Sequence, residues 1–466
     1  MSIGAKVTSI ICLLAPLTQA GLNPARDLGP RVVSWMMGWG AAAFPDHVGG
    51  FFHVYVLGPA LGGWAAALFF VHVLEPAMKG PMAGGSEPPP SALGTEMQTN
   101  TRLILVGGFL GAGKTTLLWE AASRLAKRDL RVGLITNDQA PELVDTVWLS
   151  RGEPKVAEVS GSCFCCNFPG LIDAMSKLRS DATADVLIAE PVGSCTDLSA
   201  TIIQPLKERL DKNLVVAPLS VLADPLRLRD IMSGGTAGLH KSAAYIFRKQ
   251  LEEADVIVIG KIDLLPASEL QDLRAKVAGA YPLATVFGVS ALTGEGLDEW
   301  LDATLQADEA GLHLAEVDYD IYAEGEAVLG WLNATFRLQS SLTNWNDLAE
   351  KLLRALSRRF DAMGASVGHV KVVFEARGDF VVGNLIGTGE TVSVRGSGAP
   401  SSHARMTLNA RVEMTPQALE SIVREELAAV TVAEDITATQ LAWRCLSPGR
   451  PQPTYRYDHL VAAGSG

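Results

Sequence analysis

Short apolar runs alternate with amphipathic segments through the middle of the chain. The runs have the length of buried strands, and they lie at 102–106, 131–136, 156–159, 185–189, 214–222, 255–259 and 284–289. Between the first two runs, segment 116–127 places its leucines and alanines on one face, as an amphipathic helix does. Strands that alternate with helices form a parallel sheet with helices on both faces. Residues 101–308 are therefore predicted to form an α/β domain with a mostly parallel sheet.

After residue 308 the pattern changes to longer strands and two long helices. Apolar runs predict strands at 328–338, 370–375 and 405–413. Helical periodicity predicts helices over 345–360 and from Pro416 onward. The polar stretch 387–402 is predicted to be a flexible loop. This order of elements indicates a small α+β domain over 309–466.

The first hundred residues follow a third pattern. Residues 51–74 contain no Asp, Glu, Lys or Arg, and a helix of this length can cross a bilayer. Segment 7–17 is also apolar but shorter, and residues 79–100 are rich in Pro, Gly and Ser. The sequence therefore predicts a hydrophobic, helical membrane-type segment within 1–78 and a linker over 79–100.

A glycine-rich loop separates the first predicted strand from the first predicted helix. Its sequence, G-F-L-G-A-G-K-T-T, fits the pattern G-x-x-x-x-G-K-[ST] of P-loop nucleotide-binding proteins. Backbone N–H groups of such a loop surround a polyphosphate, and the helix N-terminus adds partial positive charge. Lys114 is expected to reach the terminal phosphates, and Thr115 is expected to ligate Mg²⁺. The predicted phosphate-binding residues are Gly108, Gly111, Ala112, Gly113, Lys114, Thr115 and Thr116.

Polar residues end two of the other predicted strands. Ligands of parallel sheets collect at the carboxyl ends of the strands. Asp138, after the second strand, is a candidate for binding Mg²⁺ or sensing the γ-phosphate, although a turn-forming Asn-Asp fits its spacing equally well. The Glu-Pro-x-Gly sequence at 190–193 resembles the end of a Walker-B strand, with Glu190 toward Mg²⁺ and Gly193 toward the γ-phosphate. The predicted catalytic residues are Lys114, Thr115, Asp138 and Glu190.

Two later motifs concern the nucleotide base. The Gly-Lys-Ile-Asp sequence at 260–263 resembles the guanine-reading Asn-Lys-x-Asp, with glycine in place of asparagine. Asp263 can accept hydrogen bonds from guanine N1–H and N2–H, which adenine lacks, and the stem of Lys261 can lie along the base. Ser290 and Ala291 begin a segment similar to the loop that contacts guanine O6. GTP is therefore the predicted nucleotide, although the missing asparagine weakens the case against ATP.

Three cysteines, Cys163, Cys165 and Cys166, fall within four positions after the strand at 156–159. Thiolates bind Zn²⁺, Cu(I) and similar ions, and three ligands leave one position open for exchange. Free cysteines are also common as small core residues, and a reversible disulfide would instead make the cluster a redox sensor in a P-loop regulator. The spacing, beside a glycine and a nucleotide site, favours metal binding.

Taken in order, the glycine loop, Asn-Asp, Cys-x-Cys-Cys, Glu-x-x-Gly and the guanine motif make residues 101–308 similar to the CobW-type metallochaperone GTPases. The resemblance implies that GTP binding and slow hydrolysis control the capture of a transition metal such as Zn²⁺ and its delivery to a metal-dependent client protein. It also implies that 309–466 is the small α+β domain that follows the GTPase in such proteins. The chain departs from the family at Gly260 and at Ala140.

A second resemblance concerns the N-terminal segment. Residues 21–31 (G-L-N-P-A-R-D-L-G-P-R) are similar to the second Asn-Pro-Ala box of the aquaporin and glycerol-facilitator family. By that resemblance Asn23 would face the pore and Arg26 would narrow its selectivity filter. Residues 1–78 cover only the final third of such a channel, so a membrane transport protein is the weaker alternative. A fused or vestigial segment, or a mis-called start, fits better, and 51–74 would tether the protein to a membrane.

Composition narrows the range of partners. The net charge of −12 and the lack of a Lys/Arg-rich run argue against a nucleic-acid partner. Six cysteines in 466 residues are too few for a disulfide framework, which favours reduced thiols and a cytoplasmic GTPase. A homodimer is compatible with the sequence but is not indicated by any motif.

Overall fold

The computed structural model describes residues 33–39, 68, 72, 100–138, 155–160, 162–181, 183–209, 213–387, 392–396 and 398–462. Contacts divide the chain into two compact units, Met1–Glu96 and Met97–Gly466. In the first unit the described stretch includes the π-helix η1 (Trp35–Trp39). Asn23, Arg26 and nearly all of the predicted span 51–74 lie outside the described residues. Within the described ranges, the helices are too short or too polar for any of them to cross a membrane.

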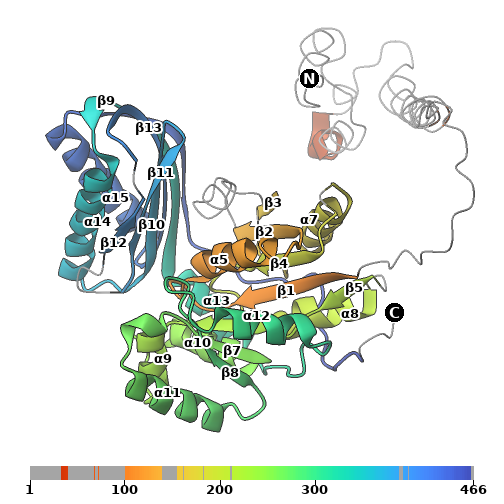
Figure 1. The fold of residues 1–466 in the computed structure, drawn as a ribbon. Coiled ribbons are helices and arrows are strands. Elements are labelled where there is room, and N and C mark those ends of the chain that lie inside the picture. Colours follow the sequence, from red (N-terminus) through yellow and green to blue (C-terminus); the bar gives the residue numbers. More distant parts are fainter. Residues whose placement is uncertain are drawn as a thin grey trace, which may run out of the picture. The chain divides into compact units, whose positions relative to one another are not determined.

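The second unit begins with a parallel sheet in the strand order β3-β2-β4-β1-β6-β7-β8, with β5 paired to β1 (Figure 1). The pairings are parallel, as the sequence predicts. The strands are β1 (Thr101–Gly107), β2 (Val132–Asp138), β3 (Lys155–Ser160), β4 (Val186–Glu190), β5 (Leu214–Val216), β6 (Ser220–Ala223), β7 (Val256–Ile259) and β8 (Thr285–Gly288).

The predicted single strand at 214–222 is wrong in one respect, because it is two strands. β5 pairs with the start of β1 and β6 with its end, and residues 217–219 separate them. Pro218 lies in this break, and a proline has no backbone N–H to donate to a strand ladder. The apolar character of the whole run reflects burial of both strands and of the turn between them.

Helices cover both faces of this sheet because side chains alternate along its strands. Leu103 and Leu105 of β1 face one apolar cluster, whereas Ile104 and Val106 face another. The first cluster includes residues of α7 and α10, and the second includes residues of α5 and α12. The helices are α5 (Lys114–Ala126), α7 (Phe168–Asp181), α8 (Gln204–Arg209), α9 (Pro225–Met232), α10 (Lys241–Glu252), α11 (Ala267–Ala280), α12 (Leu297–Gln306) and α13 (Tyr319–Ala327), with a π-turn η5 (Ser199–Ile203) and a 3-10 turn η6 (Ile262–Leu264).

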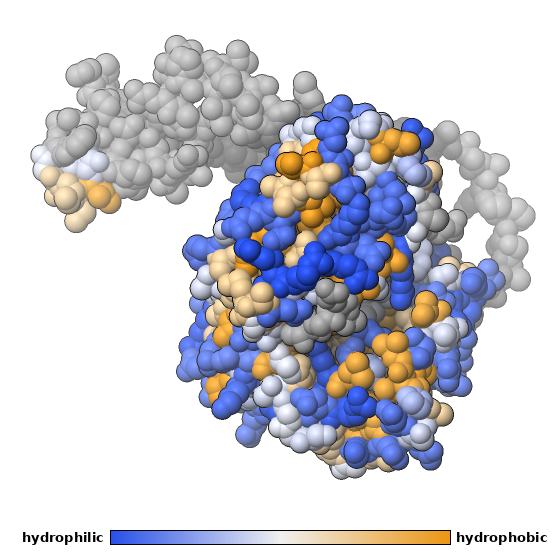
Figure 2. Space-filling view, turned by 90° about the vertical axis from the view of Figure 1, so that its left-hand side faces the viewer, coloured by the Kyte–Doolittle hydropathy of each residue, from blue (hydrophilic) through white to orange (hydrophobic). Residues whose placement is uncertain are grey.

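A second sheet follows, antiparallel and in the order β12-β11-β10-β13-β9-β14. Its strands are β9 (Leu329–Thr343), β10 (Val367–Ala376), β11 (Asp379–Leu385), β12 (Val392–Arg395), β13 (Ser401–Glu413) and β14 (Thr437–Leu446). Figure 1 shows α14 (Trp345–Ala362) and α15 (Pro416–Ala433) side by side along one face of this sheet. Figure 2 turns that side toward the viewer, and its surface is largely hydrophilic with scattered hydrophobic residues.

The predicted strands and helices of this region are confirmed, but the stretch 387–402 is not only a loop. It contains β12, whose residues pair with β11. The strand alternates half-buried and exposed side chains at the sheet edge, so it lacks the apolar run that would have predicted it. The sequence prediction also missed β11, β14 and α13.

Alternation along β10 and β13 gives the second sheet two different faces. Val370, Val372 and Phe374 pack into the core under α14 and α15. His369 and Lys371, the polar residues that alternate with these apolar ones, lie on the opposite face. The register places Lys371 beside Asn409 and His369 beside Arg411 on the neighbouring strand. This polar face belongs to the site described next.

Candidate functional site

A cavity of about 440 Å³ lies at the carboxyl ends of the parallel strands. Its size falls within the range of small-molecule sites in proteins. The loop after β1, the ends of β2 and β4 and the segments after β7 and β8 form one side, and β10, β11, β12 and β13 of the second sheet form the other. The described residues lining it include five cationic side chains and two carboxylates, so the cavity suits an anion. The cationic residues are Lys114, Lys261, Lys371, Arg395 and Arg411.

The loop after β1 has the backbone geometry of a phosphate-binding loop. Gly108 has φ +128°, and a Cβ there would lie 2.1 Å from the carbonyl oxygen of Leu222, so only glycine fits. Gly113, with φ +102°, precedes the first residue of α5. The Nζ of Lys114 donates to the carbonyl oxygen of Gly108 at 2.8 Å, which holds the lysine back over its own loop.

Thr115 and Glu190 meet at the end of β4. The Oγ1 of Thr115 donates to Glu190 Oε2 at 3.1 Å, and Lys114 Nζ lies 3.8 Å from Glu190 Oε1. All three side chains are buried. Gly193 approaches the same place, since a Cβ on it would lie 3.0 Å from Lys114 Nζ. A hydroxyl and a carboxylate with this spacing are the oxygen ligands that Mg²⁺ prefers beside a polyphosphate.

The two base motifs lie together at the ends of β7 and β8. Asp263 Oδ1 accepts a hydrogen bond from Ser290 Oγ at 2.5 Å. Lys261 Nζ donates to the carbonyl oxygen of Gly111 at 2.8 Å and to Asp224 Oδ2 at 2.8 Å. Lys261 therefore connects the segment after β7 to the phosphate loop. Gly260, which stands where the guanine motif has asparagine, has no side chain with which to make such a bond.

The structure brings most of the predicted nucleotide residues to one cavity. The predicted residues that line it are Gly111, Ala112, Gly113, Lys114, Thr115, Thr116, Glu190, Gly193, Lys261, Asp263 and Ala291. Two predicted residues do not line the cavity but bond to residues that do. The carbonyl oxygen of Gly108 accepts from Lys114, and Ser290 donates to Asp263. Asp138 is the last residue of β2, and its side chain is not among those described. The roles given to these residues remain predictions.

The sequence prediction missed the contribution of the second sheet. Lys371 Nζ donates to Thr115 Oγ1 at 3.2 Å, so a side chain from β10 reaches the expected magnesium ligand. His369 is half-buried on the same face, and its buried Nδ1 has no hydrogen-bond partner among the described residues. Burial, together with the charges of Lys371 and Arg411, holds the pKa of His369 well below its usual value, so the imidazole is neutral. In the sequence, the only sign that the second sheet forms one side of the cavity is the alternation of polar and apolar residues in β10 and β13.

Arg227 connects the two sides of the cavity, the phosphate loop and the second sheet. Its side chain is buried, and it donates to the carbonyl oxygen of Leu110 at 2.8 Å and to that of Val367 at 2.9 Å. Leu110 belongs to the phosphate loop and Val367 begins β10. A buried guanidinium that satisfies carbonyls on both sides makes the phosphate loop and the second sheet one structural unit.

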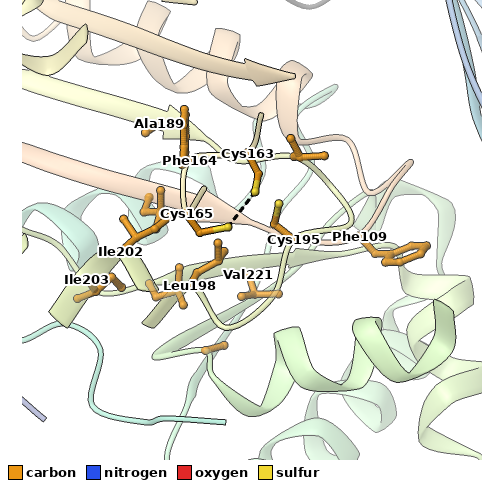
Figure 3. Packing of buried hydrophobic residues seen from close by; sticks show 14 of the residues in the cluster. Phe109, Cys163, Phe164, Cys165, Ala189, Cys195, Leu198, Ile202, Ile203 and Val221 are labelled. Atoms are coloured by element: carbon orange, nitrogen blue, oxygen red, sulfur yellow. Dashed lines mark hydrogen bonds between the residues drawn. The ribbon is translucent and has the colours of Figure 1, made fainter. Parts of the chain in front are cut away.

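The cysteine cluster lies after β3, in the turn that precedes α7. The Sγ atoms of Cys163 and Cys165 are 2.8 Å apart, and those of Cys165 and Cys166 are 3.8 Å apart. The three sulfurs lie within 4.8 Å of one another, as three ligands of one ion require. Figure 3 shows that Cys195 also points its sulfur toward Cys163 and Cys165.

Protonation in this cluster is uneven. Hydrogen bonds from the thiols of Cys165, Cys166 and Cys195 lower the pKa of Cys163, so it is the first of the cluster to become a thiolate. Glu326 lies nearby and accepts a hydrogen bond from Ser194 Oγ at 2.7 Å. Burial raises the pKa of Glu326 to about 8, so at neutral pH this side chain is protonated.

Asn137 connects the cysteine loop to the nucleotide cavity. It lines the cavity at the end of β2, and its Nδ2 donates to the carbonyl oxygens of Val159 at 2.7 Å and Ser162 at 2.8 Å. Its Oδ1 accepts from the backbone N–H of Phe164 at 2.8 Å. One side chain therefore holds the first part of the cysteine loop, from Val159 to Phe164.

The last described segment of the chain covers the cysteine loop. The backbone N–H of Thr454 donates to the carbonyl oxygen of Cys165 at 2.8 Å, and that of Gln452 donates to Cys166 Sγ at 3.3 Å. Tyr455 packs edge-on against Phe168 at the start of α7. No motif in the sequence indicated this contact.

Two family models match the chain. Residues 102–287 match the CobW/HypB/UreG nucleotide-binding domain, and residues 1–70 match the major intrinsic protein family. Both resemblances predicted from the sequence are confirmed. Residues 102–287 carry a nucleotide-binding domain of the CobW/HypB/UreG type, and a region similar to major intrinsic proteins precedes it.

Curated relatives agree with these two regions. A protein named zinc chaperone CobW from Pseudomonas aeruginosa is 27% identical, with 43% of this chain and 60% of the relative covered. A zinc-regulated GTPase metalloprotein activator 1 from Dictyostelium discoideum is 25% identical, with 39% of this chain and 44% of the relative covered. The glycerol uptake facilitator of Escherichia coli is 39% identical over 72 residues, which are 15% of this chain and 25% of that protein. The chain thus spans 60% or less of the length of these relatives.

Among solved structures, the Zn(II)-bound YjiA GTPase from E. coli matches 71% of this chain and 98% of its own at 17% identity, with a TM-score of 0.31. A TM-score this low does not support a functional argument.

Proposed function

We propose that this chain is a GTP-dependent metallochaperone. It would bind a transition metal such as Zn²⁺ through Cys163, Cys165 and Cys166, and its affinity for that metal would depend on GTP binding and slow hydrolysis. Support comes from the CobW/HypB/UreG domain at 102–287, from the three clustered sulfurs, and from the names of the relatives.

The observation that carries the proposal is the position of Asn137. Its side chain lines the nucleotide cavity and makes three hydrogen bonds to the cysteine loop. A nucleotide that displaces Asn137 changes the shape of the metal-binding turn. A metal that tightens the turn changes the nucleotide site in return, because coupling between two sites is reciprocal.

The nucleotide would bind along the loop after β1. Lys114 would leave the carbonyl of Gly108 for the terminal phosphates, and Thr115 with Glu190 would hold Mg²⁺. Mg²⁺ would neutralise part of the phosphate charge during hydrolysis. Asp263 would read guanine, with Ser290 keeping its carboxylate in place. The donors and their spacing fit these groups, since a hydroxyl, a carboxylate and two lysines converge there.

The test is a Zn²⁺ titration of the full chain under anaerobic conditions, with and without Mg²⁺ and a non-hydrolysable GTP analogue. Coupling of the usual size changes the metal affinity by roughly 5- to 150-fold. Titration of the analogue with and without Zn²⁺ should give the same factor. Superimposable curves in both experiments would refute the coupling.

A matched pair of variants tests the role of Asn137. Asn137→Ala removes the three hydrogen bonds to the cysteine loop, and we expect the coupling factor to fall toward one. Asn384→Ala is the control, because Asn384 lines the same cavity from β11. Coupling lost equally in both variants would assign the effect to the cavity in general.

A redox regulator is the second candidate, because the sulfurs of Cys163 and Cys165 are only 2.8 Å apart. Oxidation of two thiols to a disulfide needs only a small movement at this distance. Mass spectrometry after mild oxidation would distinguish the two functions. A reversible Cys163–Cys165 disulfide in a protein that retains no metal favours the regulator.

Further parts of the proposal follow from the resemblances. The metal would pass to a metal-dependent client protein, and the GTPase would work in the cytoplasm, tethered to a membrane through 51–74. We divide the chain into a channel-like segment (1–78), a linker (79–100), the GTPase domain (101–308) and an α+β domain (309–466). Cross-linking in cells would identify a client and would reveal a homodimer.

A further inference from the structure

Cys195 belongs to the sulfur cluster although it lies far from the Cys-x-Cys-Cys motif in the sequence. It is 1% exposed and belongs to the same buried cluster as Cys163 and Cys165. Figure 3 shows its sulfur at the Cys163–Cys165 pair. We propose that Cys195 is a fourth thiolate ligand of the metal, supplied by the segment that also lines the nucleotide cavity at Gly193. This inference rests on the proposed metal-binding function.

The spacing of the three motif sulfurs, which lie within 4.8 Å of one another, is close to that around a tetrahedral ion. A tetrahedral ion with metal–sulfur bonds of about 2.3 Å holds its sulfurs about 3.8 Å apart. Cys165 and Cys166 already have this separation, at 3.8 Å. Cys163 and Cys165, at 2.8 Å, would need to open by about 1 Å, and an ion between them would do this. Figure 3 shows the sulfur of Cys195 directed toward the Cys163–Cys165 pair, so an ion that opens this pair would lie next to a fourth sulfur.

The surroundings of Cys195 favour a ligand held in place. Gln250 Nε2 donates to the carbonyl oxygens of Gly193 at 3.1 Å and of Cys195 at 2.7 Å, which fixes the turn that carries the thiol. Leu198, Ile202 and Val221 pack around the sulfurs. A thiolate in such an apolar site is costly unless a cation neutralises it. The three buried cysteines, Cys163, Cys165 and Cys195, are therefore stable as neutral thiols or as ligands of an ion.

The alternative is that Cys195 is a small core residue, as buried cysteines often are. That interpretation accounts for its burial but gives no reason for its sulfur to be directed toward those of Cys163 and Cys165. It also leaves unexplained why the thiol lies two residues after Gly193, at which the chain passes beside Lys114.

The position of Cys195 has a consequence for metal release. Gly193 lines the nucleotide cavity, and the sulfur of Cys195, two residues later, is directed toward those of Cys163 and Cys165 (Figure 3). Movement of Gly193 with the γ-phosphate would carry Cys195 toward or away from the ion. Structural zinc sites with four ligands are closed, whereas three ligands leave a position open for exchange. The number of sulfur ligands would thus change with the state of the nucleotide.

Cobalt spectroscopy on the full chain tests this proposal. Co²⁺ replaces Zn²⁺, and the sulfur-to-cobalt charge-transfer absorption grows with the number of thiolate ligands. We expect Cys195→Ala to reduce this absorption by about one quarter and to weaken Zn²⁺ binding by at least about tenfold. Cys445→Ser is the control, since Cys445 is half-buried in β14 and bonds to the carbonyl oxygen of Pro416. It should change neither quantity.

A second measurement does not depend on a variant. X-ray absorption of the unmutated, Zn²⁺-loaded protein counts the sulfur ligands directly, and we expect four without nucleotide. Three sulfurs, with unchanged binding in Cys195→Ala, would overturn the fourth ligand but leave the metallochaperone intact. Failure of the unmutated protein to bind any metal would instead refute the proposed function itself.

Discussion

Replacing Lys371 by methionine tests whether the second sheet is part of the nucleotide site. Its Nζ lies 3.2 Å from Thr115 Oγ1, the atom expected to ligate Mg²⁺. An ammonium group and Mg²⁺ cannot share this oxygen, because two cations at such a distance repel one another. On nucleotide binding the lysine must therefore turn to the phosphate oxygens.

The size of the effect follows from Coulomb's law. A unit charge about 4 Å from a phosphate oxygen contributes about 4 kcal/mol at an effective dielectric constant of ~20. Lys371 is partly exposed and gives up its bond to Thr115, so more than half of this energy is offset. A net loss of about 1–2 kcal/mol remains, which raises the Kd for GTP by roughly 5- to 30-fold.

The assay is competition binding with a fluorescent GTP analogue in the presence of Mg²⁺. Lys276→Met is the matched control, because Lys276 is an exposed residue of α11 and carries the same charge. Thermal unfolding of both variants verifies that they fold. Equal affinities of Lys371→Met, Lys276→Met and the unmutated protein would show that the second sheet contributes nothing to nucleotide binding.

Three further predictions concern other groups. Asp263→Ala should abolish a preference for GTP over ATP of roughly tenfold or more, and equal affinities in the unmutated protein would contradict the guanine assignment. Burial raises the pKa of Glu253 to about 8, so its contribution to stability is complete below about pH 4.5 and is lost as pH rises through 8. Glu253→Gln should flatten this dependence, on the order of a few kcal/mol, in urea unfolding at pH 5 and pH 8, and a slope that persists would assign the effect to other groups. A chain beginning at Met97 should keep its GTP and Zn²⁺ affinities, and loss of both would make the preceding residues part of the fold.

The fold of the nucleotide domain could be predicted from the sequence because its signals are local. A buried parallel strand is a continuous apolar run, and a phosphate loop needs glycines at fixed positions. The same reasoning failed at 214–222, where burial made the turn around Pro218 as apolar as the strands beside it. It failed again at β12, an edge strand whose exposed residues look like a loop.

The missed parts of the site have a different cause. Lys371 and Arg227 bond to residues distant in the sequence, and Cys195 shares a buried cluster with two distant cysteines; none of the three lies in a motif. Their positions depend on the packing of the second sheet and on the turn after Glu190. The polar alternation of β10 was visible in the sequence, but it did not indicate what that face would meet.

Under the proposed function, the strand order determines which segments would connect the cysteine loop to the phosphate loop. The cysteine loop follows β3 and the phosphate loop follows β1, and the order β3-β2-β4-β1 places two strand ends between them. Neighbouring strands lie about 4.8 Å apart, so the two loops are separated by about 14 Å, too far for direct contact. The two intervening ends carry Asn137 and the segment from Gly193 to Cys195. Asn137 lines the nucleotide cavity and donates to the cysteine loop, and Gly193 lines the same cavity two residues before Cys195, so the proposed coupling would pass through these two strand ends.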